Sequence, residues 1–306
     1  MAQTLKAGVA GAGVFGGYHA KKYAQLKGVT LAAVFDLDLD RAQAMAEPLG
    51  ARGFDDYAAF LDAVDVVTVA TPAVAHAAPA LAALLAGKHA YVEKPLAVSA
   101  SDGAELVAAA QAGDLILAVG HQERVVFQAM GLFDLPHAPL RLEAVRRGPP
   151  SPRNLDVSTA LDLMVHDMDL GLALARAQAN KVTADGSADT LIADVLFSDG
   201  FEARFEASRV AAERHRTMKL VYPSGEVEID FLTRAFRNTT GFPLLEDFAE
   251  TPAGRDPLGA SVQAFLDAAA GKAPRPAVTG VEAQAALNLA LDADRAAGVI
   301  SVPAAD

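Results

Sequence analysis

Cysteine is absent from the 306-residue sequence. Its absence excludes disulfide bonds, zinc sites built on thiolates and a cysteine nucleophile. A chain without disulfides suits a reducing compartment, so we expect a cytoplasmic protein.

Positive charge is also scarce. Lys and Arg total 26 against 38 for Asp and Glu, which gives a formal net charge of −12 and a pI near 5.0. Such a chain repels polyanions, so we expect neither nucleic acids nor anionic membrane surfaces as partners.

Long hydrophobic runs are nearly missing. Residues 66–87 lack Lys, Arg, Asp and Glu, and a membrane-spanning helix needs about 20 apolar residues. However, Thr71-Pro72, His76 and Pro79 interrupt the stretch, which is rich in alanine rather than leucine. A buried strand, a loop and a helix are therefore predicted here. The N-terminal residues show no secretory pattern, and we expect no membrane association.

The length and the 52% hydrophobic content predict two domains. Up to residue 120, short apolar runs without alternation take turns with helical segments, which is typical of a doubly wound parallel sheet covered on both faces. The strands are expected at Leu5–Ala10, Thr30–Phe35, Val64–Ala70, His89–Val92 and Leu115–Val119. Helices are expected at Arg41–Leu49, Val74–Ala86 and Asp102–Ala112, with a further one following Gly16.

From residue 121 to residue 306 the pattern changes to that of an α+β domain. Apolar and polar residues alternate over Phe201–Ser208 and Glu226–Phe231, which predicts antiparallel strands with one covered face. A helix over Ser158–Arg176 would cover that face, and closing helices are expected over Asp256–Ala270 and Val281–Ala297.

The first strand leads into Gly11-x-Gly13-x-x-Gly16, and Asp36 closes the second strand. In this context the glycines allow a tight turn, close approach of backbone amides to a pyrophosphate, and packing of the helix on the strand. An acidic residue at Asp36 would accept the ribose hydroxyls and repel a 2′-phosphate, which favours NAD over NADP. Asp38 or Asp40 could share this role, and the alternative is a plain glycine turn with a helix-capping Asp.

Glu93-Lys94-Pro95 follows the strand at His89–Val92. Because carboxyl ends of the strands face the ligand crevice in such sheets, Lys94 is expected at the reactive end of the cofactor. The bond to Pro95 is a candidate cis peptide. The alternative is a solvated surface lysine.

Asp162, His166 and Asp169 are spaced to share one face of an otherwise apolar helix. Such a stripe is costly unless it borders a polar cavity, although a histidine satisfied by neighbouring carboxylates would also explain it. No second histidine cluster accompanies it, so no metal site is expected.

These motifs together resemble the glucose–fructose oxidoreductase / inositol dehydrogenase / MocA (Gfo/Idh/MocA) family over nearly the whole chain. The resemblance is carried by residues 11–16, Thr71-Pro72 with His76, Glu93-Lys94-Pro95, Gly120-His121 with Glu123-Arg124, and Asp162 with His166-Asp167 and Asp169. Ala73 departs from the pattern, since relatives often carry Asn there.

The resemblance implies an N-terminal Rossmann domain at 1–120 and a C-terminal substrate-binding domain at 121–306 with a large open-faced, mainly antiparallel sheet. It implies dimers or tetramers formed through that sheet, and NAD(P)-dependent oxidation of a sugar or polyol hydroxyl. Lys94 and His166 would be catalytic, either one acting as the base, with Asp162 beside the substrate. Cofactor contacts would come from Gly11, Gly13, Val14, Phe15, Gly16, Asp36, Thr71, Pro72, His76, Glu93 and Lys94. Substrate contacts would come from Lys94, His121, Glu123, Arg124, Asp162 and His166.

Within the family, the segments around His121 and His166 resemble enzymes that oxidise the 3-hydroxyl of UDP-N-acetylglucosamine or its uronate, making a 3-keto sugar nucleotide for transamination. Four arginines could neutralise the diphosphate or could be surface ion pairs: Arg124, Arg146, Arg147 and Arg153. The rival hypotheses are an inositol or monosaccharide dehydrogenase, a non-catalytic NAD-binding regulator, and a metal-dependent hydrolase.

Overall fold

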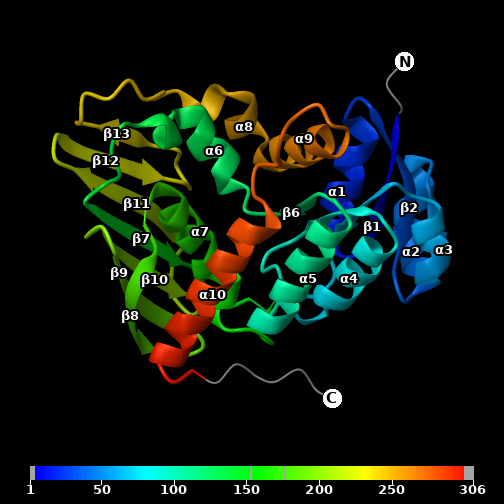
Figure 1. Cartoon of the computed structure of the whole chain (residues 1–306), viewed down its shortest axis with the longest axis horizontal. Helices are drawn as coiled ribbons and strands as arrows, with labels where there is room; N and C mark the ends of the chain where they lie inside the picture. The colour runs from blue at the N-terminus through cyan, green and yellow to red at the C-terminus, as the bar shows by residue number, and fades with distance from the viewer. Residues whose placement is uncertain (1–3, 152–153, 176, 300–306) are drawn as a thin grey trace. The chain divides into compact units, whose positions relative to one another are not determined.

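The computed structural model describes residues 4–151, 154–175 and 177–299, which form two compact units (Figure 1). The first unit comprises Met1–Gln122 and Asp256–Gln284, and the second comprises Glu123–Arg255 and Ala285–Asp306. The sequence predicts one boundary near residue 120. The structure differs because residues 256–284 return to the first unit.

A six-stranded parallel sheet forms the first unit, in the order β3-β2-β1-β4-β5-β6. This is the strand order of dinucleotide-binding folds and confirms the predicted doubly wound sheet. Its strands are β1 (Leu5–Ala10), β2 (Val29–Phe35), β3 (Arg52–Phe54), β4 (Val66–Val69), β5 (His89–Val92) and β6 (Leu117–Val119).

Helices bury both faces of this sheet, which explains why its strands lack alternation. One face packs on α3, α4 and α5, and the other packs on α1, α2 and α9. Their bounds are α1 Val14–Gln25, α2 Leu39–Ala46, α3 Tyr57–Asp62, α4 Ala77–Leu85, α5 Ala100–Ala112 and α9 Pro257–Ala269. Short 3-10 helices lie at Glu47–Leu49 and Ala73–Ala75.

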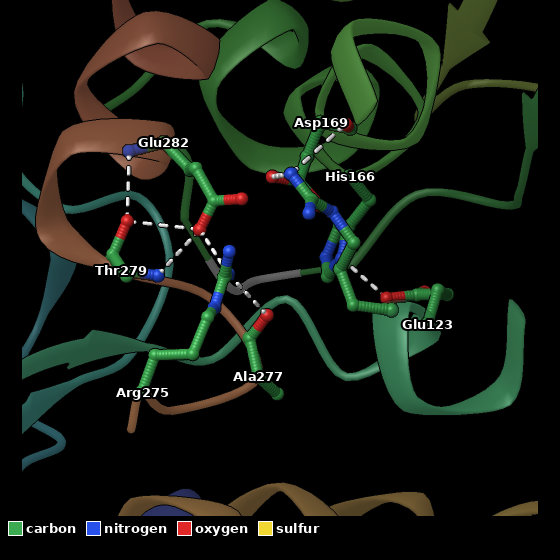
Figure 2. Close-up of polar contacts among 8 residues, drawn as sticks. Glu123, His166, Asp169, Arg275, Ala277, Thr279 and Glu282 are labelled. Carbon is green, nitrogen blue, oxygen red and sulfur yellow. Dashed lines mark hydrogen bonds and ion pairs between the residues drawn. The ribbon is translucent and has the colours of Figure 1, made fainter. Parts of the chain in front are cut away.

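The returning segment 256–284 completes the first unit in two places. Helix α9 packs Phe265 against Tyr91 of β5, with ring centroids 5.7 Å apart. After α9, the N–H of Val119 in β6 donates to the carbonyl of Val278, so the chain pairs with the outer strand of the sheet. Thr279 then caps α10 (Gly280–Ala296): its hydroxyl oxygen accepts from the N–H of Glu282 at 3.3 Å, and its own N–H donates to the Glu282 carboxylate at 2.9 Å (Figure 2).

The second unit is built on a seven-stranded sheet in the order β13-β12-β11-β7-β10-β9-β8. All neighbouring pairs are antiparallel except β7 and β10, so the predicted mainly antiparallel sheet is confirmed. Its strands are β7 (Arg141–Arg147), β8 (Ala179–Gly186), β9 (Thr190–Phe197), β10 (Glu202–Ser208), β11 (His215–Tyr222), β12 (Gly225–Asp230) and β13 (Phe236–Asn238). Its helices are α6 (Glu123–Met130), α7 (Val165–Leu174), α8 (Pro252–Arg255), and the 3-10 turns Leu132–Asp134 and Phe248–Glu250.

Helix α7 covers one face of this sheet. A side chain at Gly171 of α7 would come within 2.9 Å of the Phe205 ring on β10, so helix and strand approach as closely as glycine allows. The opposite face is charged and exposed among the described residues. Ion pairs cross its strands, among them Arg204–Asp194 at 2.8 Å, Lys219–Glu226 at 2.8 Å and Arg237–Glu228 at 3.5 Å.

Within the described ranges, no helix is both long and apolar enough to cross a membrane. In the same residues, no cluster of His, Asp and Glu has the geometry of a metal site.

Candidate functional site

The turn between β1 and α1 is shaped by its three glycines. Gly11 has φ 105°, and a side chain there would lie 2.7 Å from the carbonyl oxygen of Ala70. A side chain at Gly16 would overlap the carbonyl oxygen of Gly11, whereas one at Gly13 would meet nothing within 4 Å. Helix α1 begins after Gly13 without a side-chain cap. The turn therefore leaves open space in front of the amide end of a helix, which suits an anion such as a pyrophosphate.

Asp36 lies at the end of β2, next to this turn. Its Oδ2 accepts from the N–H of Ala12 at 2.7 Å, and its Oδ1 accepts from the N–H of Asp38 at 3.2 Å. Lone pairs on both oxygens remain for ribose hydroxyls. Asp38 instead accepts from the N–H of Arg41 and caps α2, so Asp36 is better placed than Asp38 for a nucleotide.

Exposed apolar side chains flank the same turn. Val14 is 62% exposed and Leu37, directly after Asp36, is 88% exposed. Together with the open turn and the carboxylate, they fit an adenosine diphosphate moiety.

Glu93, Lys94 and Pro95 directly follow β5, and the Lys94–Pro95 peptide is cis, as the sequence suggests. Glu93 is buried, and its Oε1 lies 2.7 Å from Nε2 of His19. Burial raises the pKa of Glu93, but the hydrogen bond from His19 and the charges of His19, Lys94 and His76 outweigh this and lower it overall. Glu93 is therefore an ionised carboxylate inside the first unit, and Lys94 next to it is half-buried.

His76 connects the loops that follow β4 and β5. Its Nδ1 lies 2.7 Å from the carbonyl oxygen of Pro95, and its Nε2 lies 3.0 Å from that of Thr71. The ring is only 2% exposed, and burial lowers the pKa of His76 despite both carbonyls. The structure thus places His76 behind the Thr71-Pro72 and Lys94-Pro95 backbone, where it would act on a cofactor through those loops.

In the second unit, a π-helical turn at Ala160–Met164 precedes α7. The sequence predicts one uninterrupted helix over Ser158–Arg176, of which Arg176 lies outside the described residues. Such wide turns occur frequently at functional sites. Asp162 lies in this turn and accepts from Nδ2 of Asn154 at 2.6 Å.

Asp169 has a different role from Asp162 and His166. It is fully buried in α7 and pairs with Arg124 of α6, with Nε–Oδ2 at 2.6 Å and Nη2–Oδ1 at 2.9 Å. The three residues expected to share one polar face therefore differ in role, because Asp169 forms a structural ion pair with Arg124.

His166 faces Glu123 across the gap between α7 and α6 (Figure 2). Its Nδ1 lies 3.0 Å from Oε2 of Glu123, and its side chain is 14% exposed. Glu123 also pairs through Oε1 with Arg146 and with Arg216. The carboxylate can therefore hold the Nδ1–H tautomer of His166, which leaves Nε2 with a lone pair.

The arginines predicted to neutralise a diphosphate are engaged within the chain. Arg124 pairs with Asp169, Arg146 bonds both oxygens of Asp167, and Nε of Arg147 donates to Glu206 at 2.7 Å. Arg153 lies outside the described residues. The three described arginines therefore form ion pairs within the chain, with Arg124 and Arg146 buried rather than at the surface, and contact with a diphosphate stays a prediction.

Among the other predicted substrate residues, His121 is buried in the first unit and Glu123 is buried in the second. The structure adds His19, Asn154, Asp167 and Arg216, whose partners are 8 to 93 residues away in sequence. Asp167 belongs to the motif that follows His166, whereas no local pattern distinguishes His19, Asn154 or Arg216, although a positive φ of 54° at Asn154 marks a specialised turn.

The start of the π-helical turn rests on a buried acid. Asp294 of α10 is 1% exposed, and its Oδ2 accepts from the hydroxyl of Ser158 at 2.5 Å. Burial raises the pKa of Asp294 to about 6, and the hydrogen bond from Ser158 only partly opposes this.

Because this pKa lies above that of an unfolded aspartate, the contribution of Asp294 to stability is fully present below about pH 4 and is lost as the pH rises through about 6. We expect Asp294→Asn to stabilise the protein relative to wild type at pH 8, by up to about 3 kcal/mol, and to gain much less at pH 4. Chemical denaturation at both pH values measures this. Asp256→Asn should show the opposite trend, because Lys22 and the N–H of Gly259 lower the pKa of Asp256 more than burial raises it. A pH-independent effect of Asp294→Asn would contradict the assignment.

Comparison with known proteins agrees with the fold of both units. The family model "GFO_IDH_MocA: Oxidoreductase family, NAD-binding Rossmann fold" matches residues 5–121. A UDP-N-acetylglucosamine 3-dehydrogenase of Acidithiobacillus ferrooxidans is 36% identical over 284 residues, which is 88% of this chain and 90% of the relative. A solved structure of that enzyme from the same organism superposes with a TM-score of 0.87 at 34% identity, covering 97% of this chain and 98% of that one.

Other relatives are more distant. An inositol 2-dehydrogenase 3 of Saccharopolyspora erythraea is 33% identical over 176 residues, 54% of this chain and 52% of the relative. A WlbA dehydrogenase from Bordetella pertussis, solved with NADH and UDP-GlcNAcA, has a TM-score of 0.83 at 19% identity, over 97% of this chain and 96% of that one, and shows likeness of fold. The family model matches the N-terminal part, and the UDP-N-acetylglucosamine 3-dehydrogenase relative matches 88% of the chain. The chain therefore belongs to the Gfo/Idh/MocA family of NAD-binding oxidoreductases.

Proposed function

We propose that this enzyme oxidises the 3-hydroxyl of UDP-N-acetylglucosamine, or of a related UDP-sugar, to a 3-keto sugar nucleotide that is later transaminated. Support comes from the UDP-N-acetylglucosamine 3-dehydrogenase described above, which matches 88% of the chain at 36% identity. The main structural support is the His166–Glu123 pair. Glu123 can hold the proton of His166 on Nδ1, and Nε2 can then act as the base.

In the proposed mechanism, Nδ1–H of His166 donates to Glu123, and Nε2 accepts the proton of the sugar hydroxyl. Lys94 donates a hydrogen bond to the alkoxide as it develops. NAD supplies the acceptor for the hydride that leaves the sugar carbon. The reverse assignment, with Lys94 as base, requires that burial beside a cation hold the amine neutral. Asp162, one turn before His166, would orient the sugar.

The residues that would hold NAD lie in the first unit. The Gly11–Gly16 turn and the start of α1 would bind the pyrophosphate, with Val14 and Phe15 beside it, and Asp36 would bind the ribose. Thr71-Pro72, placed by His76, and Lys94 next to Glu93 would border the nicotinamide.

Replacing Asp36 by Ala should weaken NAD binding by about 10- to 100-fold, since hydrogen bonds to a charged group contribute roughly 1.5–3 kcal/mol. NADP binding should weaken less or improve, because the negative charge that repels its 2′-phosphate is lost. Fluorescence titration of both dinucleotides measures the ratio. Asp38→Ala is the control, since Asp38 caps α2, and it should change stability more than preference. An unchanged NAD/NADP ratio in Asp36→Ala would refute the role.

A substrate panel tests the function itself. The purified enzyme with NAD is offered UDP-N-acetylglucosamine, its uronate, free N-acetylglucosamine and myo-inositol, and both NADH formation and melting temperature are followed. A ligand that binds the folded state adds about 2.7 kcal/mol of stability at a hundredfold excess over its Kd. We expect turnover with the UDP-sugars alone. Turnover of inositol or of the free sugar would establish the monosaccharide alternative, and NAD binding without any turnover would establish a regulator.

We also propose that the enzyme is cytoplasmic and forms homo-oligomers through the exposed face of the seven-stranded sheet. The absence of cysteine supports a cytoplasmic location, and the wide exposed face of the sheet supports the formation of homo-oligomers. Light scattering on the purified protein should give the mass of a dimer or tetramer, and a monomer at micromolar concentration would contradict the assembly.

A further inference from the structure

The Glu123 carboxylate is shared by three side chains of the second unit. Its Oε2 accepts from Nδ1–H of His166 at 3.0 Å. Its Oε1 lies 3.4 Å from Nη1 and Nη2 of Arg146 and is in direct contact with Nη2 of Arg216. What compensates this carboxylate therefore decides how strongly it attracts a proton to His166.

The two arginines do not compensate Glu123 equally. Arg146 makes two short bonds to Asp167, with Nε–Oδ2 at 2.8 Å and Nη2–Oδ1 at 2.7 Å. Its distance to Glu123 is longer, so Asp167 takes most of its charge. Arg216 is consequently the main counter-charge of Glu123.

The surroundings of Arg216 determine how strongly its charge acts on Glu123. Its guanidinium lies 5.3 Å from the centre of the Phe231 ring, and its side chain is 28% exposed. Burial lowers the pKa of Arg216 to about 10, which still leaves it cationic at neutral pH. A partly buried ion pair of this kind is screened less by solvent and salt than an exposed pair.

The two carboxylates in contact with Arg146, Glu123 and Asp167, are balanced only when Arg216 is included. Glu123 and Asp167 are negative, Arg146 and Arg216 are positive, and so the cluster is neutral when His166 is neutral. Two other acidic residues lie on the neighbouring elements, within the described part of this unit. Asp169 is balanced by Arg124, whereas Asp162 accepts from the neutral amide of Asn154, which does not cancel a carboxylate charge.

We propose that Arg216 of β11 is a positioning residue that shares the Glu123 carboxylate and thereby keeps His166 neutral, ready to accept a proton at neutral pH. The effect of Arg216 on catalysis rests on the proposed role of His166 as base. Its effect on the protonation of His166 does not depend on that role. Without Arg216 the cluster becomes net negative, and a proton on the imidazole is favoured.

The test is the titration of His166 in Arg216→Gln, followed through the ring C–H signal by NMR and assigned by its loss in His166→Ala. We expect the midpoint of the His166 titration to rise by about one pH unit or more. Glu123 then lacks its main counter-charge, and an opposite charge within about 4–6 Å favours the protonated imidazole by this amount. The acidic limb of the kcat/KM profile should move upward by the same amount. Activity would then fall by up to about tenfold at pH values below both midpoints, and it would be nearly kept at pH 9. Arg216→Lys, which keeps the charge, should return the midpoint toward wild type.

Two further variants separate electrostatics from structure. Arg204→Gln removes an equal charge from a half-exposed pair with Asp194 on the charged face of the same sheet, and it should leave the His166 midpoint unchanged. Glu123→Gln should lower the midpoint, and adding Arg216→Gln to it should produce a smaller rise than in the wild-type background, because only the direct repulsion between the two cations is then lost. This pair of measurements also serves if Arg216→Gln alone fails to fold.

An unchanged midpoint in Arg216→Gln, or an equal rise in the Glu123→Gln background, would overturn the inference. If the midpoint moves as expected while His166→Ala retains turnover, the electrostatic coupling stands and the proposed role of His166 as base fails.

Discussion

Replacing His166 by Ala should reduce kcat about 10²–10⁴-fold, since this is the usual contribution of a positioned acid or base. Lys94→Ala should reduce kcat within the same range, because the developing alkoxide loses its hydrogen-bond donor. NAD affinity should be nearly unchanged in both variants, since neither side chain is placed at the pyrophosphate or the adenosine ribose. Steady-state kinetics with the UDP-sugar, together with fluorescence titration of NAD, measure both quantities.

Matched controls come from exposed residues of the same type. His215→Ala on β11 and Lys27→Ala after α1 remove an imidazole and an amine from the surface, and both should retain wild-type turnover. Wild-type turnover in both His166→Ala and Lys94→Ala would refute the proposed mechanism. A large loss in one variant alone, with the pH profile of the other unchanged, would identify which group is the base.

Arg124→Met should destabilise the protein by about 3–5 kcal/mol, which is the usual cost of removing one partner of a buried ion pair. The reason is the environment of Asp169, which is 0% exposed and would keep an uncompensated carboxylate. Replacing both residues, as in Arg124→Met with Asp169→Leu, should cost less than the single change, because no buried charge is left behind. Urea denaturation of the three proteins measures these differences.

The Arg204–Asp194 pair is the control for burial. Its geometry is similar, with Nη1 at 2.8 and 2.9 Å from the two carboxylate oxygens, but both side chains are about half exposed, at 52% and 53%. Arg204→Met should therefore cost less than about 1 kcal/mol. If Arg124→Met were equally mild and instead raised the KM for a UDP-sugar, the result would support the prediction that Arg124 binds the diphosphate.

The first unit could be predicted from sequence because its signals are local. The glycine spacing, the acid at the end of β2 and the unbroken apolar strands all lie within a few dozen residues, and each has one physical meaning. The return of residues 256–284 could not be predicted, since an amphipathic helix such as α9 does not specify which sheet it will cover.

Prediction of the second unit was limited by long-range pairing. Alternation correctly predicted strands at β10 and β12, but the parallel partner β7 pairs Arg141 with Glu202 across 61 residues. The same limit applies to the arginines. Sequence shows that Arg124 and Arg146 carry charge, whereas their carboxylate partners Asp169 and Asp167 follow only from the packing of α6, α7 and β7.

Helix α9 also has a consequence for how the chain is made. Tyr91 of β5 packs on Phe265 and lies 3.0 Å from the hydroxyl of Ser261, so one face of the first sheet needs residues from near the end of the chain. During translation, domains generally fold from the N-terminus onward as they emerge from the ribosome. Here the ribosome must synthesise every strand of the second sheet before α9 emerges. Helices α1 and α2 can already cover part of this face, but the part that α9 covers stays exposed until the second sheet has been synthesised.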